Sequence, residues 1–177
     1  MKAIADMSQA ELAAFIQSHL LSKGIDVVLS GGAVVAFYTS GKYVSRDLDL
    51  VNRFASKRSA IKNAMEEIGF HEVDRHFAHP DTEFFVEFPP GPLSIGEEDN
   101  IAVHDLVLET GHLRLLSPTD CVKDRLSWYL HFGDAQALEQ ALLVAREHHI
   151  DLNGIRKWSR AEGKLPEFDA IRRRFAP

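Results

Sequence analysis

Residues 30–50, SGGAVVAFYTSGKYVSRDLDL, decide the fold of this chain, because they join a glycine turn to a spaced pair of aspartates. The turn follows an apolar run at residues 25–29, which predicts a buried strand. Asp47 and Asp49 lie in a second predicted strand, residues 47–51. Because side chains alternate along a strand, both carboxylates are expected on one face, about 6.6 Å apart along the chain.

These two features suggest a common chemistry. Gly31 and Gly32 let the backbone approach a ligand closely, and the free N–H groups at the start of the predicted helix 33–39 favour phosphate. Two carboxylates on one face can share Mg²⁺, which typically takes one or two carboxylates plus substrate phosphates. A phosphate cradle beside a carboxylate pair predicts phosphoryl or nucleotidyl transfer.

The arrangement resembles the DNA polymerase beta-type nucleotidyltransferase superfamily. Its signature is an apolar residue, Gly-Gly or Gly-Ser, a spacer of about a dozen residues, and Asp-apolar-Asp-apolar. The flanking sequence is most similar to a small bacterial branch found among toxin–antitoxin and abortive-infection proteins. The matching pieces here are Leu29, Ser30-Gly31-Gly32, the spacer 33–46 and Asp47-Leu48-Asp49-Leu50.

The same residues allow other interpretations. A glycine turn followed by a solvated strand end would give a similar pattern without any site. Asp-x-Asp at a strand end also occurs in haloacid-dehalogenase-like phosphatases and in metal-dependent glycosyltransferases. The phosphatase places its pair after the first core strand, whereas here a glycine-turn strand and a helix come first. That order favours the nucleotidyltransferase.

The resemblance implies a third carboxylate on a neighbouring strand. Glu87, within the aromatic run 84–88, is the first choice, because a charge there costs free energy unless it is paired or bound to metal. Glu83, on the same strand face, is the alternative. The superfamily more often has Asp at this position. Asp47, Asp49 and Glu87 would then be both the catalytic residues and the ligands of Mg²⁺ or Mn²⁺.

The resemblance also implies residues that hold the substrate. The three residues of the turn, Ser30, Gly31 and Gly32, would cradle the phosphates. Ser45 would bind phosphate or brace the strand, and Arg46 would fix a carboxylate or a nucleotide oxygen. A basic residue on the first helix after the sheet, Lys123, would reach the triphosphate.

The implied function is metal-dependent transfer of a nucleoside monophosphate from an NTP to an RNA, a protein or a small molecule. The alternative is a degenerate domain that binds a nucleotide or a partner protein, within a toxin–antitoxin pair. The basic residues near the C-terminus would either meet RNA phosphates or form a solvated helical surface.

The overall composition is that of an ordinary globular protein, with 177 residues, 45% hydrophobic and 26% charged. No apolar run approaches the length of a membrane span, and the N-terminus lacks the apolar stretch of a signal peptide, so we expect a cytoplasmic protein with no membrane partner. Cys121 is the only cysteine and should be a reduced thiol. The spacing of the histidines fits no standard zinc pattern.

The pattern along the chain predicts an α+β protein, with a small mixed sheet flanked by helices (1–116) and a C-terminal helical extension packed on it (117–177). Ser8 and Glu11 form a capping-box pattern that starts the first helix, and Ser117-Pro118 starts the first helix of the extension. Further strands are expected at 70–76, 83–88, 103–108 and 113–116. Further helices are expected from residue 56 or 57 to 68, and after 134, 151 and 168.

Overall fold

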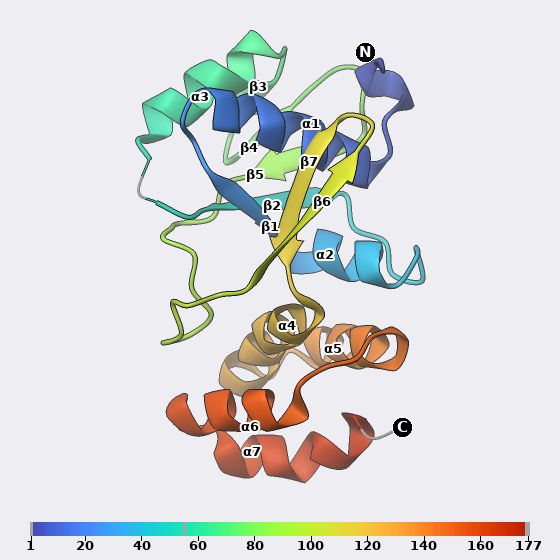
Figure 1. Ribbon diagram of the computed structural model, residues 1–177, viewed down its shortest axis with the longest axis vertical. Coiled ribbons are helices and arrows are strands. Elements are labelled where there is room, and N and C mark those ends of the chain that lie inside the picture. Colours follow the sequence, from blue (N-terminus) through green and yellow to red (C-terminus); the bar gives the residue numbers. More distant parts are fainter. Residues whose placement is uncertain (1, 55, 176–177) are drawn as a thin grey trace.

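The computed structural model describes residues 2–54 and 56–175. They form one seven-stranded sheet and seven α-helices, with the last four helices stacked below the sheet in Figure 1. Two short 3-10 helices, Ile4–Asp6 and Arg172–Phe175, lie near the ends. The strands are β1 Val27–Ser30, β2 Asp47–Asn52, β3 His71–Val73, β4 His76–Ala78, β5 Phe85–Glu87, β6 Val103–Leu108 and β7 Gly111–Leu116. The helices are α1 Gln9–Ser22, α2 Gly31–Tyr38, α3 Arg58–Glu67, α4 Pro118–Phe132, α5 Ala135–Glu147, α6 Leu152–Ala161 and α7 Leu165–Ile171.

The sheet is mixed, with the strand order β3-β4-β5-β2-β1-β7-β6. The two central strands, β1 and β2, are antiparallel to each other, and each has a parallel neighbour on its other side, β7 and β5 respectively. Two antiparallel hairpins, β3-β4 and β6-β7, complete the edges. The α+β fold class predicted from the sequence is confirmed.

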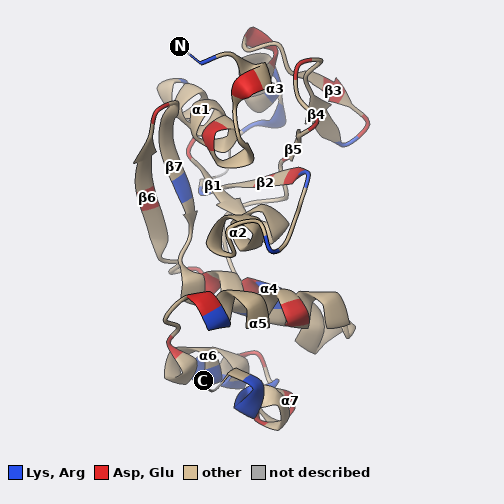
Figure 2. Cartoon of the chain, turned by 90° about the vertical axis from the view of Figure 1, so that its right-hand side faces the viewer, with Lys and Arg blue, Asp and Glu red and all other residues tan. Residues whose placement is uncertain are grey.

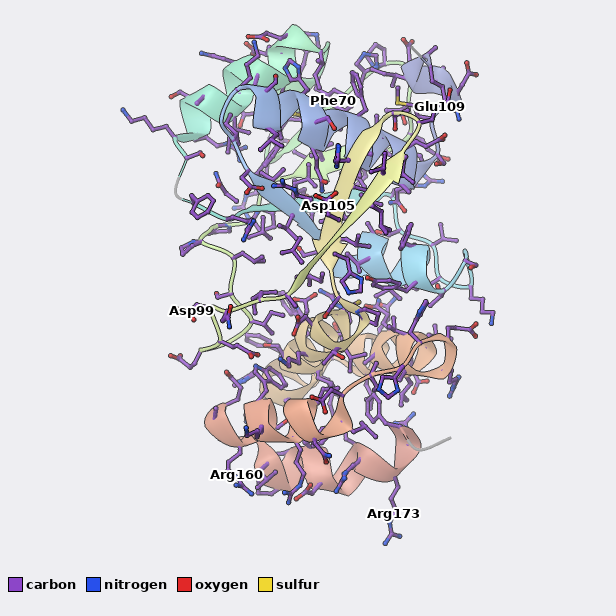
Figure 3. The ribbon with its side chains drawn as sticks, viewed as in Figure 1. Phe70, Asp99, Asp105, Glu109, Arg160 and Arg173 are labelled. Atoms are coloured by element: carbon purple, nitrogen blue, oxygen red, sulfur yellow. The ribbon has the colours of Figure 1, made fainter. Side chains whose placement is uncertain are left out.

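Helices cover the sheet where its strands are apolar. The α1 helix begins with the predicted capping box, in which Ser8 and Glu11 each bond the other's backbone N–H, and it packs against β7, β1 and α3. The α2 helix packs against β2 and contacts α4 and α5. The core between these layers contains fully buried Phe70, Phe77 and Leu12. Phe70, labelled in Figure 3, lies at the end of the sheet farthest from the C-terminal helices.

The first three C-terminal helices begin where the sequence predicts, whereas α7 begins at Leu165, three residues before the start expected at 168. Ser117 caps α4 by accepting from the Asp120 backbone N–H at 3.1 Å, and Gly133 ends it with φ = 72°. Asp134 then caps α5 by accepting from two backbone N–H groups, and Asp151 caps α6 in the same way. Because α4 also packs on α2 and β7, the division of the chain at residue 116 stays a prediction.

One predicted element is wrong. The single strand expected at residues 70–76 is a hairpin, in which β3 turns at Asp74 and returns as β4. Asp74 has φ = 54°, a left-handed conformation that Asp adopts more readily than most residues. The segment 70–78 contains no Gly or Pro, so the usual sequence signals of a turn did not reveal the reversal. Within the described part of the chain, no helix has both the length and the apolar character needed to cross a membrane.

A truncation on the buried face of β2 tests this packing. Leu50 is fully buried, so Leu50→Ala should lower the free energy of unfolding by about 3 kcal/mol through lost burial and a new cavity. Val107→Ala, at a side chain 75% exposed on β6, is the control and should change it by less than about 0.5 kcal/mol. Equal effects in denaturant unfolding would contradict the assigned faces.

Candidate functional site

The two aspartates of β2 lie on one face of the strand. Asp47 and Asp49 are half-buried, and they alternate with Leu48 and Leu50, which are fully buried against the core. In Figure 2 an acidic segment of β2 follows directly after a basic residue in the preceding connection. Both carboxylates therefore project away from the core of the sheet, as the two-residue spacing predicts.

The pairing of three strands places a row of polar side chains beside Asp49. Ser30 of β1 is paired with Asp49 in register, and Asp49 is paired with Glu87 of β5. Residues directly opposite in neighbouring strands project to the same face of a sheet. Ser30, Asp49 and Glu87 therefore form one row across β1, β2 and β5, with Asp47 one alternation along. His76 of β4 is paired with Glu87 and extends the row.

The glycine turn lies directly against this row. Gly31 has φ = +68°, and a Cβ atom at this position would come 2.0 Å from Oδ2 of Asp49. At Gly32 a Cβ atom would lie 3.1 Å from Oγ of Ser45. The absence of side chains thus lets the start of α2 contact the carboxylate, and it brings backbone N–H groups of the helix start to the same place.

The surroundings of Asp49 disfavour its ionised form. Burial, together with the neighbouring Glu87 carboxylate, raises the pKa of Asp49 from 3.8 to about 6. The Arg125 guanidinium opposes this shift, whereas the carboxylates of Asp124 and Asp47 add to it. Clustered carboxylates repel each other unless a cation is present, so this site favours a positive charge beside Asp49.

The cation that acts on Asp49 comes from α4, but it is Arg125. The proposed phosphate ligand Lys123 is buried and pairs with Glu98 at 2.6 Å and with Asp120 at 3.0 Å. Arg125 lies two positions further along α4, on a different face of the helix, and pairs with Asp124 at 2.6 Å. Burial lowers the pKa of Arg125, but Asp124 and Asp49 outweigh it and keep that pKa above its ordinary value.

The remaining sequence-derived residues lie around the start of β2. Oγ of Ser45 accepts a hydrogen bond from the Asp47 backbone N–H at 3.3 Å, so the serine braces the strand. Arg46 pairs with Glu83 at 3.3 Å on the surface. Glu83 therefore has its own partner and lies outside β5, whereas Glu87 lies beside Asp49. Gln9, which the sequence did not single out, donates to the Ser45 backbone carbonyl at 2.9 Å.

The donor set suits a hard divalent cation in its chemistry. Mg²⁺ prefers carboxylate oxygens and is usually held by one or two protein carboxylates plus substrate phosphates. Asp47 and Asp49, with the raised pKa of Asp49, meet that requirement. Within residues 2–54 and 56–175, no group of three His, Cys, Asp or Glu side chains is already arranged to hold a metal ion, so the ligand set of Asp47, Asp49 and Glu87 stays a prediction.

Comparison with solved structures identifies the fold. No protein-family model and no curated protein sequence matches the chain. An antigenic nucleotidyltransferase-like protein from Paracoccidioides brasiliensis superposes with a TM-score of 0.59 at 15% identity, over 78% of this chain and 76% of that chain. This is a nucleotidyltransferase-like fold.

Two structures of the antibiotic-resistance factor ANT(2'')-Ia share this nucleotidyltransferase-like fold. The crystal structure of its complex with adenylyl-2''-tobramycin gives a TM-score of 0.55 at 16% identity, over 96% of this chain and all of that chain. The solution structure gives a TM-score of 0.54 at 13% identity, over 88% of each chain. The likeness therefore extends through the C-terminal helices as well as the sheet.

Replacement of Gly31 tests the contact between the turn and Asp49. Gly31→Ala adds a clash with Asp49 to the strain of a positive φ, so it should lower the free energy of unfolding by about 3 kcal/mol. Gly24→Ala is the matched control, since Gly24 has φ = +75° with nothing within 4 Å of a new Cβ, and should cost about 1 kcal/mol. Equal losses in denaturant unfolding would place Asp49 away from the turn.

The pKa of Asp49 predicts a pH dependence of stability in metal-free buffer. Because the folded-state value of about 6 lies above 3.8, the fold keeps the Asp49 proton longer than the unfolded chain does. This contribution to stability is complete below pH 4 and is lost as the pH rises to about 6. Asp49→Asn should therefore be about 3 kcal/mol more stable than the wild type at pH 7, but not at pH 4. A constant difference across this range would refute the shift.

Proposed function

We propose that the chain transfers a nucleoside monophosphate from an NTP to a hydroxyl group of an acceptor, with Mg²⁺ or Mn²⁺ as cofactor. The observation that carries this proposal is the row of Ser30, Asp49 and Glu87 across three strands, with Gly31 against Asp49. The proposal is supported because two aspartates, a further acid and a glycine turn lie together on a fold shared with nucleotidyltransferase-like proteins.

Each group has a role in the transfer. The turn at Ser30, Gly31 and Gly32 holds the phosphates, and Arg125 offsets the negative charge around Asp49. The acceptor oxygen forms a bond to the α-phosphorus while the bond from that phosphorus to the bridging oxygen breaks. Pyrophosphate leaves with the electron pair, and the hydroxyl proton passes to Glu87, which lies beside Asp49.

The metal would be held by Asp47 and Asp49, with Glu87 as the third carboxylate when substrate is bound. When bound, it would supply charge stabilisation for the phosphates. Its presence would also relieve the repulsion around Asp49, which is why Mg²⁺ should raise the thermal stability of the wild type more than that of Asp49→Asn.

A small hydroxyl-bearing molecule is the acceptor class we favour. The ANT(2'')-Ia structure that is matched over its whole length contains an adenylylated small molecule, tobramycin. An RNA acceptor would need free cations, but two arginines of the basic tail are engaged, Arg156 with Asp169 at 2.8 Å and Arg174 with Glu139 at 2.5 Å. Arg173 points away from the sheet at the far end of the molecule (Figure 3).

A second candidate is a binding module that holds a nucleotide or a partner, such as the cognate member of a toxin–antitoxin pair, without turnover. What favours it is that no three ligating side chains converge among the described residues. The binding module and the enzyme differ in one outcome, which is release of pyrophosphate.

A transfer assay separates these functions. With α-labelled NTP, Mg²⁺ and a panel of aminoglycosides, tRNA and protein, the wild type should label a small-molecule acceptor and release pyrophosphate. Asp47→Asn and Asp49→Asn should reduce the rate by about 10²-fold or more, because they remove charge at the phosphates. Glu87→Gln should keep NTP binding and lose transfer.

The matched control is Glu83→Gln, which removes an exposed acid paired with Arg46 and should keep most of the transfer rate. If Glu83→Gln lost transfer and Glu87→Gln kept it, the third carboxylate would be Glu83. NTP binding by the wild type without any transfer or pyrophosphate release would favour the binding module.

A further inference from the structure

An exposed aromatic pair lies near the C-terminal end of α4. The side chain of Trp128 is 49% exposed and that of Phe132 is 75% exposed, and their ring centroids are 5.3 Å apart at an interplanar angle of 41°. They are two of the three exposed Phe and Trp side chains in the described part of the chain. Exposed aromatic surface of this kind typically marks a site of recognition.

The pair lies on the same face of α4 as the charged groups of the site. Residues four apart share a helix face, so Asp124, Trp128 and Phe132 form one row. With a rise of 1.5 Å per residue, Trp128 lies about 6 Å and Phe132 about 12 Å along the helix from Asp124. Asp124 is one of the carboxylates that act on Asp49, so the row leads away from the site.

The packing of α4 indicates the same direction for the row of Asp124, Trp128 and Phe132. The helix contacts α2, whose first residue, Gly31, lies against Asp49. In Figure 2, α4 extends past α2 toward the side of the molecule on which β3, β4 and β5 lie. The C-terminal end of α4, which carries the aromatic pair, thus extends toward the side of the molecule on which β5 lies.

We propose that Trp128 and Phe132 are a stacking platform for the base of the NTP whose phosphates lie at the glycine turn. This inference rests on the proposed function. The base is the uncharged, planar part of the nucleotide, and both of its faces can stack on aromatic rings. A polyamine acceptor would instead seek carboxylates, which the aromatic row beyond Asp124 does not provide.

The platform is tested on the full chain with ATP and with inorganic triphosphate, each with Mg²⁺. Trp128→Ala should weaken ATP binding by about tenfold and leave triphosphate binding unchanged, because only ATP carries a base. Trp128→Phe should restore most of the affinity for ATP. Phe54→Ala is the matched control, since Phe54 is another exposed aromatic residue, 65% exposed, beyond the opposite end of β2.

Fluorescence gives a second readout. The only other tryptophan, Trp158, is buried and donates a hydrogen bond to the Ile95 carbonyl. ATP should quench the wild-type emission, triphosphate should not, and the quench should disappear in Trp128→Phe while ATP still binds.

Three outcomes would overturn the platform. The first is an unchanged affinity of Trp128→Ala for ATP. The second is an equal loss of affinity for triphosphate. The third is a loss of affinity for the acceptor alone, which would assign the rings to acceptor binding. These results differ from failure of the proposed function itself, in which the wild type would bind neither ATP nor triphosphate and Asp49→Asn would change nothing.

Discussion

Strand pairing, contact with Gly31 and burial all act on Asp49, and the rest of the site depends on this residue. Its strand is paired on both sides, with Ser30 and Glu87 in register, so the carboxylate cannot move away along the sheet. Gly31 closes over it, and burial raises its pKa to about 6. A carboxylate held in this way is destabilising when it is ionised without a cation. A positive charge near Asp49 relieves this cost, and Arg125 is one that the chain itself supplies.

Packing in the core offsets the destabilising effect of the Asp49 carboxylate. Leu48 and Leu50, the neighbours of the aspartates, are fully buried in the core, which fixes the strand. The C-terminal helices bring Arg125 toward Asp49 and, through Asp124, help hold that cation in place. The C-terminal end of α4, with Trp128 and Phe132, extends beyond these residues. Residues of the sheet and of the C-terminal helices thus lie close together around Asp49, and the fold similarity to ANT(2'')-Ia covers both parts, over 96% of this chain.

Much of this could be predicted from the sequence, because local signals agree with the global fold. Strand alternation placed Asp47 and Asp49 on one face, and Ser8, Ser117, Asp134 and Asp151 marked helix starts through their capping chemistry. Other features depend on tertiary contacts. The hairpin at Asp74 lies in a segment without Gly or Pro, and the basic side chain of α4 that lies near Asp49 depends on how this helix is rotated against α2. No local pattern contains that rotation.

Diffraction from crystals grown with Mn²⁺ and a non-hydrolysable ATP analogue shows directly whether Asp47 and Asp49 bind the metal beside the glycine turn. Anomalous scattering locates Mn²⁺ independently of the protein atoms. We expect an anomalous peak in contact with carboxylate oxygens of both Asp47 and Asp49, with the phosphates of the analogue at Gly31 and Gly32. A peak elsewhere, or an analogue bound away from the glycine turn with the carboxylates free of metal, would contradict this expectation.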